Sequence, residues 1–311
     1  MARKIIKAIL KYPLILINRI YTHFYYKNNS IRDNCLVDNV FEGRKKVLVV
    51  APHVDDETIG AGGTLIRHKD NGDEISIVYI SDGGGSTTEG SRENLIEERK
   101  NEGIKVKDFL NAQSIYFLDE IDGQVDSNSV ELVENLYKII KNEEPNIIYT
   151  PFLIDGHRDH VATTKALISA LKTWNKNFEN IYMYEINSPI KPELINSINP
   201  MDKKDYVKKG EVYNIFDSQW AMDFNAFRLM DRRKGYLIEN TYGAEIFVKA
   251  DLESLIEMEE TLENEGFKPE QFRQLSSHYN LLFAFRNNKE MKKKYSNKIL
   301  SILQKSYAKE K

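Results

Sequence analysis

The sequence of 311 residues contains a single cysteine, Cys35, and this scarcity limits the chemistry open to the chain. One thiol cannot form an intrachain disulfide, and it cannot build a metal site from several thiolates. Sparse cysteine is also typical of proteins in a reducing compartment. We therefore expect a cytoplasmic protein without disulfide cross-links.

An excess of basic charge is missing as well. The chain has 44 Lys and Arg residues against 47 Asp and Glu residues, which gives a formal net charge of -3. No long basic block stands out along the sequence. Because binding to the phosphates of nucleic acids depends on clustered basic residues, we do not expect a nucleic acid partner.

No hydrophobic run reaches the roughly 20 apolar residues of a membrane-spanning helix. Residues 1–30 come nearest, but Lys7, Lys11, Pro13 and Arg19 interrupt their apolar stretch. No small-residue cleavage site follows, which argues against a secretory signal. The segment is basic and partly amphipathic, so two interpretations remain open: a helix packed on the protein, or a helix that makes peripheral contact with a membrane surface.

What the chain does have is a regular alternation of strand-like and helix-like segments from residue 47 onward. Such alternation, with short apolar strands, is typical of the α/β class, here a Rossmann-like, doubly wound and mainly parallel sheet covered by helices. The expected strands are residues 46–51, 74–81, 114–118, 146–151 and 180–186, and the expected helices begin after Gly63 and then cover about 93–110, 130–141 and 162–174.

Loops rich in charged and polar residues follow the first four expected strands. They are His53–Glu57, Ser81–Ser86, Asp119–Gly123 and Asp155–His160. Because ligands of such sheets bind outside the carboxyl ends of the strands, we expect these loops to converge on one edge.

Within these loops, His53 and Asp56 stand three apart on one turn, and His157 and His160 stand three apart on another. Two imidazoles and one carboxylate are a common ligand set for Zn²⁺ and Fe²⁺. A catalytic site of this kind keeps a position for water, whose pKa the metal lowers to about 7.

The remaining polar side chains suit hydrolysis. Asp55 can take the proton of the water, and His157 can protonate the leaving amine or stabilise the oxyanion. Asp159 or Glu57 could orient a ligand imidazole.

Two segments carry a resemblance to a known family. "APHVDDETIGAGGTL" at 51–65 and "TPFLIDGHRDHVATTKAL" at 150–167 resemble the paired signatures of the PIG-L/LmbE-like metal-dependent N-acetylglucosaminyl de-N-acetylases. Shorter matches recur in order at Ser81–Gly83, Arg99 with Glu102, Asp122–Gly123, Asp217–Gln219 and Gly243–Phe247. Coverage runs over about residues 45–250, so we expect a basic N-terminal segment at 1–40, the deacetylase domain at 41–250 and a helical C-terminal extension at 251–311.

The resemblance implies a zinc-dependent hydrolase that removes an N-acetyl group from an amino sugar or glycoconjugate and releases acetate. Carried over by position, the implied zinc ligands are His53, Asp56 and His160, the general base is Asp55, the acid or oxyanion partner is His157, and the sugar contacts are Arg92 and Asp122. The sequence departs from the family at Val54 and Arg158, where proline is usual. Fe²⁺ or another divalent metal, the identity of the substrate and the oligomeric state stay open.

Two other functions fit parts of the same pattern. His53, Asp55 and His157 also match the His-x-Asp…His triad of iron oxygenases, but that site belongs on an all-β jelly roll. A non-catalytic binding or membrane-tethered module would leave the acid, the base and the ligands idle.

Structural interpretations apply to the other unusual residues. We expect Arg99 and Glu102 to form either part of the site or only a surface pair, and the "GAGG" at 60–63 to serve helix packing. Residues 268–285 predict a core-facing helix with an aromatic stripe, and the charged tail after it predicts a solvated helix. The histidines expected to be ordinary core residues are His23, His68 and His278.

Overall fold

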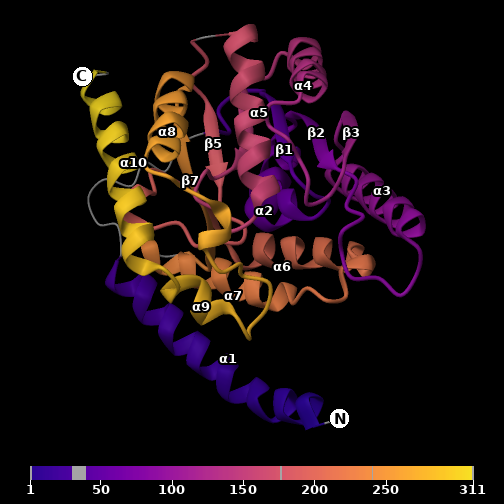
Figure 1. Ribbon diagram of the computed structural model, residues 1–311, viewed down its shortest axis with the longest axis vertical. Coiled ribbons are helices and arrows are strands. Elements are labelled where there is room, and N and C mark those ends of the chain that lie inside the picture. The colour runs from indigo at the N-terminus through magenta and orange to yellow at the C-terminus, as the bar shows by residue number, and fades with distance from the viewer. Residues whose placement is uncertain (1, 30–39, 176, 240, 310–311) are drawn as a thin grey trace.

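A computed structural model describes residues 2–29, 40–175, 177–239 and 241–309. Its centre is a seven-stranded sheet in the order β3-β2-β1-β4-β5-β7-β6 (Figure 1). The strands are β1 (Lys46–Ala51), β2 (Glu74–Ser81), β3 (Ser114–Glu120), β4 (Ile147–Pro151), β5 (Ile181–Tyr184), β6 (Ser197–Met201) and β7 (Gly243–Ala250). Cys35 and most of residues 30–40 lie outside the described part of the chain.

Strands β1 to β5 pair in parallel, and β7 runs antiparallel to both β5 and β6. The predicted doubly wound, mainly parallel α/β fold is confirmed. The strand order reverses between β1 and β4, where Val49 lies opposite Tyr149, so the two strands end at the same level. A reversal of this kind opens a crevice at the carboxyl edge, which is where doubly wound folds bind ligands.

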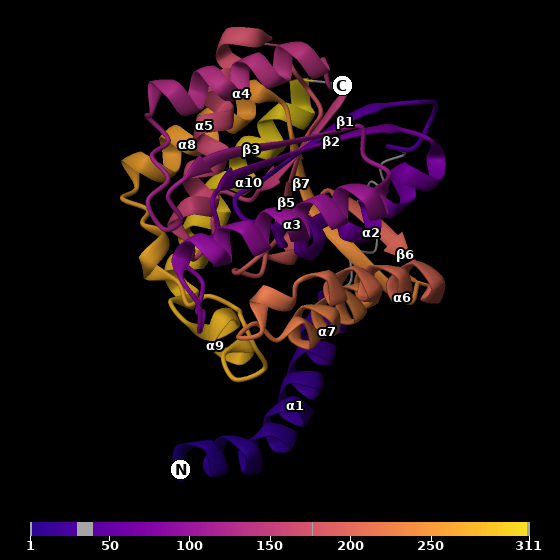
Figure 2. The same cartoon turned by 90° about the vertical axis from the view of Figure 1, so that its right-hand side faces the viewer.

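Helices cover both faces of the sheet, as Figure 2 shows with the sheet nearly edge-on. One layer contains α2 (Asp56–Asn71), α3 (Arg92–Leu110) and α6 (Lys203–Val212), and the other contains α4 (Val130–Glu143), α5 (Arg158–Trp174), α8 (Leu252–Asn264) and α10 (Lys289–Lys309). Strands β1 and β4 are almost fully buried between these layers, as their apolar sequences require.

Helix α2 begins at Asp56, a full two turns before the predicted start after Gly63. The early start puts Asp56 and Glu57 in the first helical turn, where carboxylates interact favourably with the helix dipole. It also places the "GAGG" inside the helix, against neighbours. A Cβ at Gly60 would lie 2.1 Å from the Tyr184 ring, and one at Gly63 would lie 2.4 Å from Met201 Sδ. The predicted packing role of these glycines is confirmed.

The C-terminal region differs from its prediction in two ways. Residues 268–285 contain only a short 3-10 turn (Pro269–Gln271) and α9 (Leu281–Arg286), with a non-helical stretch between them that bonds to neighbouring loops. Helix α10 is not a solvated appendage, because Tyr295, Ile299 and Ile302 are buried on the side that faces α8.

Helix α1 (Ala2–Asn28) runs along the lower end of the molecule in Figure 1, beside α7 (Phe224–Lys234) and α9. Thr22 and Tyr26 are buried on its inner side, and the Tyr25 ring packs edge-on against Phe285. Within the described residues, none of the helices combines the length and apolarity needed to cross a bilayer.

Candidate active site

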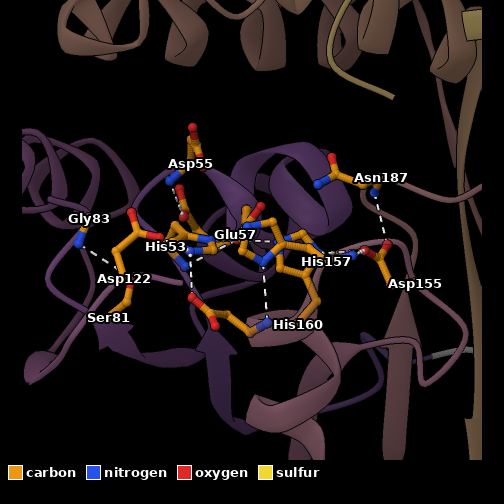
Figure 3. Close-up of polar contacts among 12 residues, drawn as sticks. His53, Asp55, Glu57, Ser81, Gly83, Asp122, Asp155, His157, His160 and Asn187 are labelled. Atoms are coloured by element: carbon orange, nitrogen blue, oxygen red, sulfur yellow. Dashed lines mark hydrogen bonds and ion pairs between the residues drawn. The ribbon is translucent and has the colours of Figure 1, made fainter. Parts of the chain in front are cut away.

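The four polar loops meet at the carboxyl edge of the sheet, as predicted. His53 Nε2, after β1, lies 3.2 Å from Asp122 Oδ1, after β3, and 3.4 Å from Asp159 Oδ2, after β4. The Gly85 N–H, after β2, donates to Asp122 Oδ2 at 3.0 Å. Figure 3 shows the imidazoles of His53, His157 and His160 gathered in the middle, with Asp122 and Asp155 on either side.

The trio His53, Asp56 and His160 comes together at the centre of these loops. Asp56 Oδ2 lies 2.9 Å from His53 Nδ1 and 3.4 Å from His160 Nε2. One ligand atom from each residue can be chosen so that all of them lie within 4.8 Å of one another. A second group, His53, Asp122, His157 and Asp159, meets the same criterion on the other side of His53.

Asp155 orients the imidazole of His160, whereas the sequence had named Asp159 or Glu57 as the residue that orients a ligand imidazole. Asp155 Oδ1 lies 2.9 Å from His160 Nδ1, which leaves Nε2 to face Asp56. Glu57 instead accepts bonds from the Asp55 N–H and the Thr58 hydroxyl, and Asp159 reaches His53 rather than His160. The expectation is therefore confirmed for Asp159, which faces the ligand imidazole of His53, and wrong for Glu57.

The charge balance of the site is strongly negative. Its buried or nearly buried carboxylates are Asp55, Asp56, Glu57, Asp122, Asp155 and Asp159. Arg99 is a permanent cation in direct contact with them, and its Nη1 lies 3.5 Å from Asp55 Oδ2. Burial alone would raise the pKa of Asp56, but the imidazoles of His160 and His53 outweigh it and lower this pKa to about 2. A cluster of buried carboxylates around converging imidazoles is the chemistry of a cation site.

Asp55 has a strained backbone, with φ at 124° and ψ at -26°. Non-glycine residues avoid this region, and such strain is concentrated at functional positions. Its side chain is buried, and this burial raises the pKa of Asp55 to about 7 although Arg99 acts in the opposite direction. A carboxylate with this pKa accepts a proton more readily than an exposed one.

Arg99 and Glu102 are not a surface pair. Arg99 is only 2% exposed, and Glu102 accepts bonds from the Ser218 backbone N–H at 2.7 Å and from its hydroxyl at 2.8 Å. The "DSQ" segment, Asp217–Gln219, thus covers Glu102. Glu102 Oε2 in turn lies 3.8 Å from Arg99 Nη1, the same nitrogen that approaches Asp55.

His157 begins α5 as its N-cap residue, and its Nδ1 accepts a bond from the Asp159 N–H at 3.2 Å. Because Nδ1 is an acceptor, the ring proton of the neutral imidazole sits on Nε2. Burial, together with the neighbouring His160 and His53, lowers the pKa of His157 to about 4. The geometry therefore presents a neutral imidazole with one N–H donor.

The two predicted sugar contacts lie at different depths. Asp122 is inside the site beside His53, whereas Arg92 sits at the rim with 45% of its side chain exposed. Arg92 Nη2 donates to Asp82 Oδ2 at 2.5 Å, and Asp82 Oδ1 in turn accepts from the Asp122 N–H. Asp82 is thus a residue that sequence reasoning missed, although it stands in the expected "SDG" loop.

The three histidines set aside as structural lie apart from this site. His68 is buried between Asp73 and Tyr149, which lie 2.6 and 2.9 Å from its two ring nitrogens. His278 is also buried, as expected, whereas His23 is half-buried on α1 and packs edge-on against Tyr236.

Comparison with known sequences gives a match to a family and to a characterised relative. The profile of the PIG-L family, described as GlcNAc-PI de-N-acetylase, matches residues 48–171. A diacetylchitobiose deacetylase of Thermococcus kodakarensis is 31% identical over 129 residues, which cover 40% of this chain and 48% of the relative. The match therefore spans about half the length of that curated relative.

Solved structures agree with this match. A conserved protein from Thermus thermophilus superposes with a TM-score of 0.58 at 25% identity, over 66% of this chain and 94% of that protein. The N,N'-diacetylchitobiose deacetylase of Pyrococcus horikoshii, solved with its inhibitor MPG, gives the same TM-score and identity over 73% of this chain and 90% of its own. Residues 48–171, which carry both ligand turns of the site, thus resemble a PIG-L family domain, and the chain shares its fold with these solved structures.

Proposed function

We propose that the protein is a zinc-dependent hydrolase that removes an N-acetyl group from an amino-sugar substrate and releases acetate. One observation carries the proposal: the trio His53, Asp56 and His160 is flanked by Asp55, a buried proton acceptor, and by His157, an N–H donor. This combination of groups is what amide hydrolysis at a metal requires.

The donor set fits a divalent cation. His53, Asp56 and His160 would hold it, because their ligand atoms converge and the surrounding carboxylates outnumber the chain's own permanent cation. Zinc is favoured because two imidazoles and one carboxylate are among its usual catalytic ligand sets. When bound, the metal would supply a Lewis acid for the acetamide carbonyl and lower the pKa of water.

Asp55 is assigned as the general base. Its backbone is fixed at both ends of the turn, because its N–H donates to Glu57 Oε2 and its C=O accepts the Thr58 and Ile59 N–H groups of α2. Arg99 Nη1 lies 3.5 Å from one oxygen of the carboxylate, Oδ2. The side chain is thereby held in one position for a proton transfer, which is the condition for efficient general-base catalysis.

His157 is assigned to the oxyanion rather than to the leaving amine. The bond from the Asp159 N–H to Nδ1 fixes the tautomer and leaves Nε2–H as the donor. A preorganised N–H donor stabilises the negative charge that develops on the carbonyl oxygen of a tetrahedral intermediate. Of the two roles left open by the sequence, this geometry favours oxyanion stabilisation.

The proposed substrate class is supported by the relatives of this chain and by two side chains, one at the rim of the site and one inside it. The Thermococcus and Pyrococcus proteins are diacetylchitobiose deacetylases, so an N-acetylated amino sugar or glycoconjugate is the proposed substrate. Arg92 at the rim and Asp122 inside offer a donor and an acceptor to sugar hydroxyls. Iron oxygenase chemistry is not favoured. Its His-x-Asp…His triad belongs on an all-β jelly roll, whereas the described residues form a mainly parallel sheet covered by helices.

Incubation of the zinc-loaded protein with N-acetylglucosamine and N,N'-diacetylchitobiose tests this function. Mass spectrometry should show a product that has lost one acetyl group, together with free acetate. Chelator-treated protein and Asp55→Asn serve as controls and should give neither product. Turnover that survives complete metal removal, or product formation at the full rate by Asp55→Asn, would contradict the proposed mechanism.

We also propose a cytoplasmic location with peripheral membrane contact through residues 1–30. The outer side of α1 exposes Tyr12, Leu16, Ile17, Ile20 and Phe24, opposite its packed face. The helix sequence contains several Lys and Arg residues and no acidic residue, which suits anionic lipid headgroups.

Replacement of Leu16 and Ile20 by Asn tests this contact without disturbing the packed face of α1. The double variant should sediment less with vesicles that contain anionic lipid, while its melting temperature stays unchanged. Val207→Asn on α6 is the matched control, because Val207 is an exposed aliphatic residue elsewhere. Equal sedimentation of all three proteins would mean that the outer stripe does not bind lipid.

A further inference from the structure

A segment outside the family match holds the site in place. Residues 272–292 run from the non-helical stretch before α9 into the first turn of α10, and they touch two loops of the catalytic edge. We propose that Lys292 and Gln274 are positioning residues, which fix the Asp155 carboxylate and, through it, the imidazole of His160. The inference rests on the proposed role of His160 as a metal ligand.

Asp155 is the point where this support reaches the site. Its Oδ1 accepts the His157 N–H at 2.8 Å and lies 2.9 Å from His160 Nδ1. Its Oδ2 accepts the N–H groups of Asn187 at 3.0 Å and Ser188 at 3.2 Å, in the loop after β5 (Figure 3). The orientation of the carboxylate therefore depends on where the Asn187–Ser188 loop lies.

The C-terminal segment sets the position of that loop by two bonds. Lys292 Nζ donates to Ser188 Oγ at 2.7 Å, and the Leu275 N–H donates to the Asn187 carbonyl at 2.7 Å. The loop is thus bonded to the carboxylate on one side and to the C-terminal segment on the other. A displacement of Lys292 would be passed to Asp155 through a single loop.

The same segment also contacts the turn that carries the histidines. Gln274 Nε2 donates to the Gly156 carbonyl at 2.9 Å, directly between Asp155 and His157. A Cβ at Gly156 would lie 3.1 Å from Gln274 Cγ and 3.2 Å from the Phe272 carbonyl oxygen. This close approach leaves room for glycine and ties the two segments together.

Burial of the Lys292 ammonium group has a desolvation cost that packing alone does not explain. It is 5% exposed, and burial lowers its pKa to about 8, although Glu185 and Asp155 act in the opposite direction. Both carboxylates gain from the charge of Lys292, and Glu185, which also pairs with Lys234 at 3.0 Å, gains more than Asp155. An apolar side chain would fill the position without this desolvation cost.

A double-mutant cycle with metal affinity as its readout tests the proposal. Zinc dissociation constants of purified full-length protein are measured by competition with a chromophoric chelator, for wild type, Lys292→Met, Ser188→Ala and the double variant. Lys292→Met should weaken zinc binding by about tenfold, the lower end of the effect of removing outer-shell partners. Its melting temperature should stay equal or rise, because a buried charge has been removed.

The double variant should bind zinc no more weakly than Lys292→Met alone, because both substitutions break one chain of contacts. Lys294→Met, which removes the same charge from an exposed ion pair on the same helix, should leave zinc affinity unchanged. Unchanged affinity in a folded Lys292→Met, or fully additive losses in the cycle, would overturn the proposal. If Lys292→Met does not fold, unchanged affinity in Ser188→Ala decides against it. Because zinc binding is measured directly, a failed deacetylase assay leaves this test intact.

Discussion

Among the described residues, two clusters of buried charged side chains differ in how their charges are balanced. The first is the candidate site. The second, which we call the lysine cluster, joins β5, α6, α7 and β7. Its members are Glu185, Lys209, Asp231, Lys234 and Glu245.

In the lysine cluster the chain supplies both signs of charge. Lys209 Nζ lies 2.7 Å from Asp231 Oδ2 and 2.7 Å from Glu245 Oε1, and Lys234 Nζ lies 3.0 Å from Glu185 Oε1. Glu245 also accepts bonds from the Gly63 and Thr64 N–H groups of α2. Each carboxylate of this cluster faces at least one of its lysines, and Glu245 fastens α2 to the sheet.

In the candidate site the carboxylates face imidazoles and one arginine instead. Their lone pairs converge on a point that no side chain of the described residues fills with a permanent positive charge. The contrast teaches that burial of charge does not by itself identify a functional site. The informative feature is a charge that the chain leaves for an external ion to balance.

The largest effect is expected from His160→Ala, which tests whether the site depends on that ion. Removal of one of three protein ligands should abolish zinc binding and activity, because the remaining pair cannot hold the metal. Elemental analysis of the purified variant measures the metal content. His23→Ala is the control and should retain a full complement of zinc. If His160→Ala also retains its zinc, His160 is not a metal ligand.

Asp55→Asn separates the chemistry of the site from its metal. The amide cannot accept a proton, so the rate should fall by roughly 10²–10⁴-fold while zinc content stays normal. Steady-state kinetics and elemental analysis on the same preparation measure both quantities. A near-normal rate would assign proton transfer to another group.

Lys209→Met tests the other half of the comparison. Loss of one partner from a buried ion pair should lower the free energy of unfolding by about 3–5 kcal/mol, because Asp231 and Glu245 lose their counter-charge. Urea unfolding measures this loss, and the folded variant should still bind zinc. Lys305→Met breaks the exposed pair with Glu257 and should cost less than about 1 kcal/mol. Equal costs for the two variants would show that the lysine cluster is no more important than a surface pair.

The smallest effect is a difference in how two buried lysines respond to pH. Burial lowers the pKa of Lys292 to about 8, below its unfolded value, so the unfolded chain binds a proton that the folded protein has released. Stability from this group therefore rises with pH. For Lys209, burial acts downward but Asp231 and Glu245 outweigh it and raise the pKa well above 10.5, so its contribution is lost only at higher pH.

Urea unfolding from about pH 7.5 to about pH 9.5 measures this difference. Wild type should gain stability relative to Lys292→Met across the range, while its advantage over Lys209→Met stays constant. A flat difference for Lys292→Met would mean that Lys292 keeps an ordinary pKa in the folded protein.

The central part of the site could be predicted because its information is local. His53, Asp55, Asp56, His157 and His160 stand on two short turns, and a parallel sheet brings the ends of its strands together whatever the details of packing. The start of α2 was predicted too late, although the packing role of its glycines was predicted: they lie inside the helix, against Tyr184 and Met201.

The supporting contacts could not be predicted because they join distant segments. Which imidazole each carboxylate meets, His160 for Asp155 and His53 for Asp159, depends on the course of one turn. The burial of Arg99 and Glu102 depends on Ser218, which lies 116 residues from Glu102 along the chain. The sequence of helix α3 is highly charged and predicts a solvated helix. No feature of that sequence indicates that residues 217–219 cover Glu102.

The backbone strain at Asp55 has a consequence for engineering. Its φ and ψ of 124° and -26° are the mirror image of an ordinary conformation, which glycine adopts as readily as its counterpart. Asp55→Gly should therefore relieve backbone strain of roughly 1–3 kcal/mol, which offsets part of the cost of leaving the buried Arg99 without this partner. The outcome would be an inert protein that keeps its metal ligands. Such a variant could be immobilised to retain the natural acetylated substrate from a cell extract without consuming it.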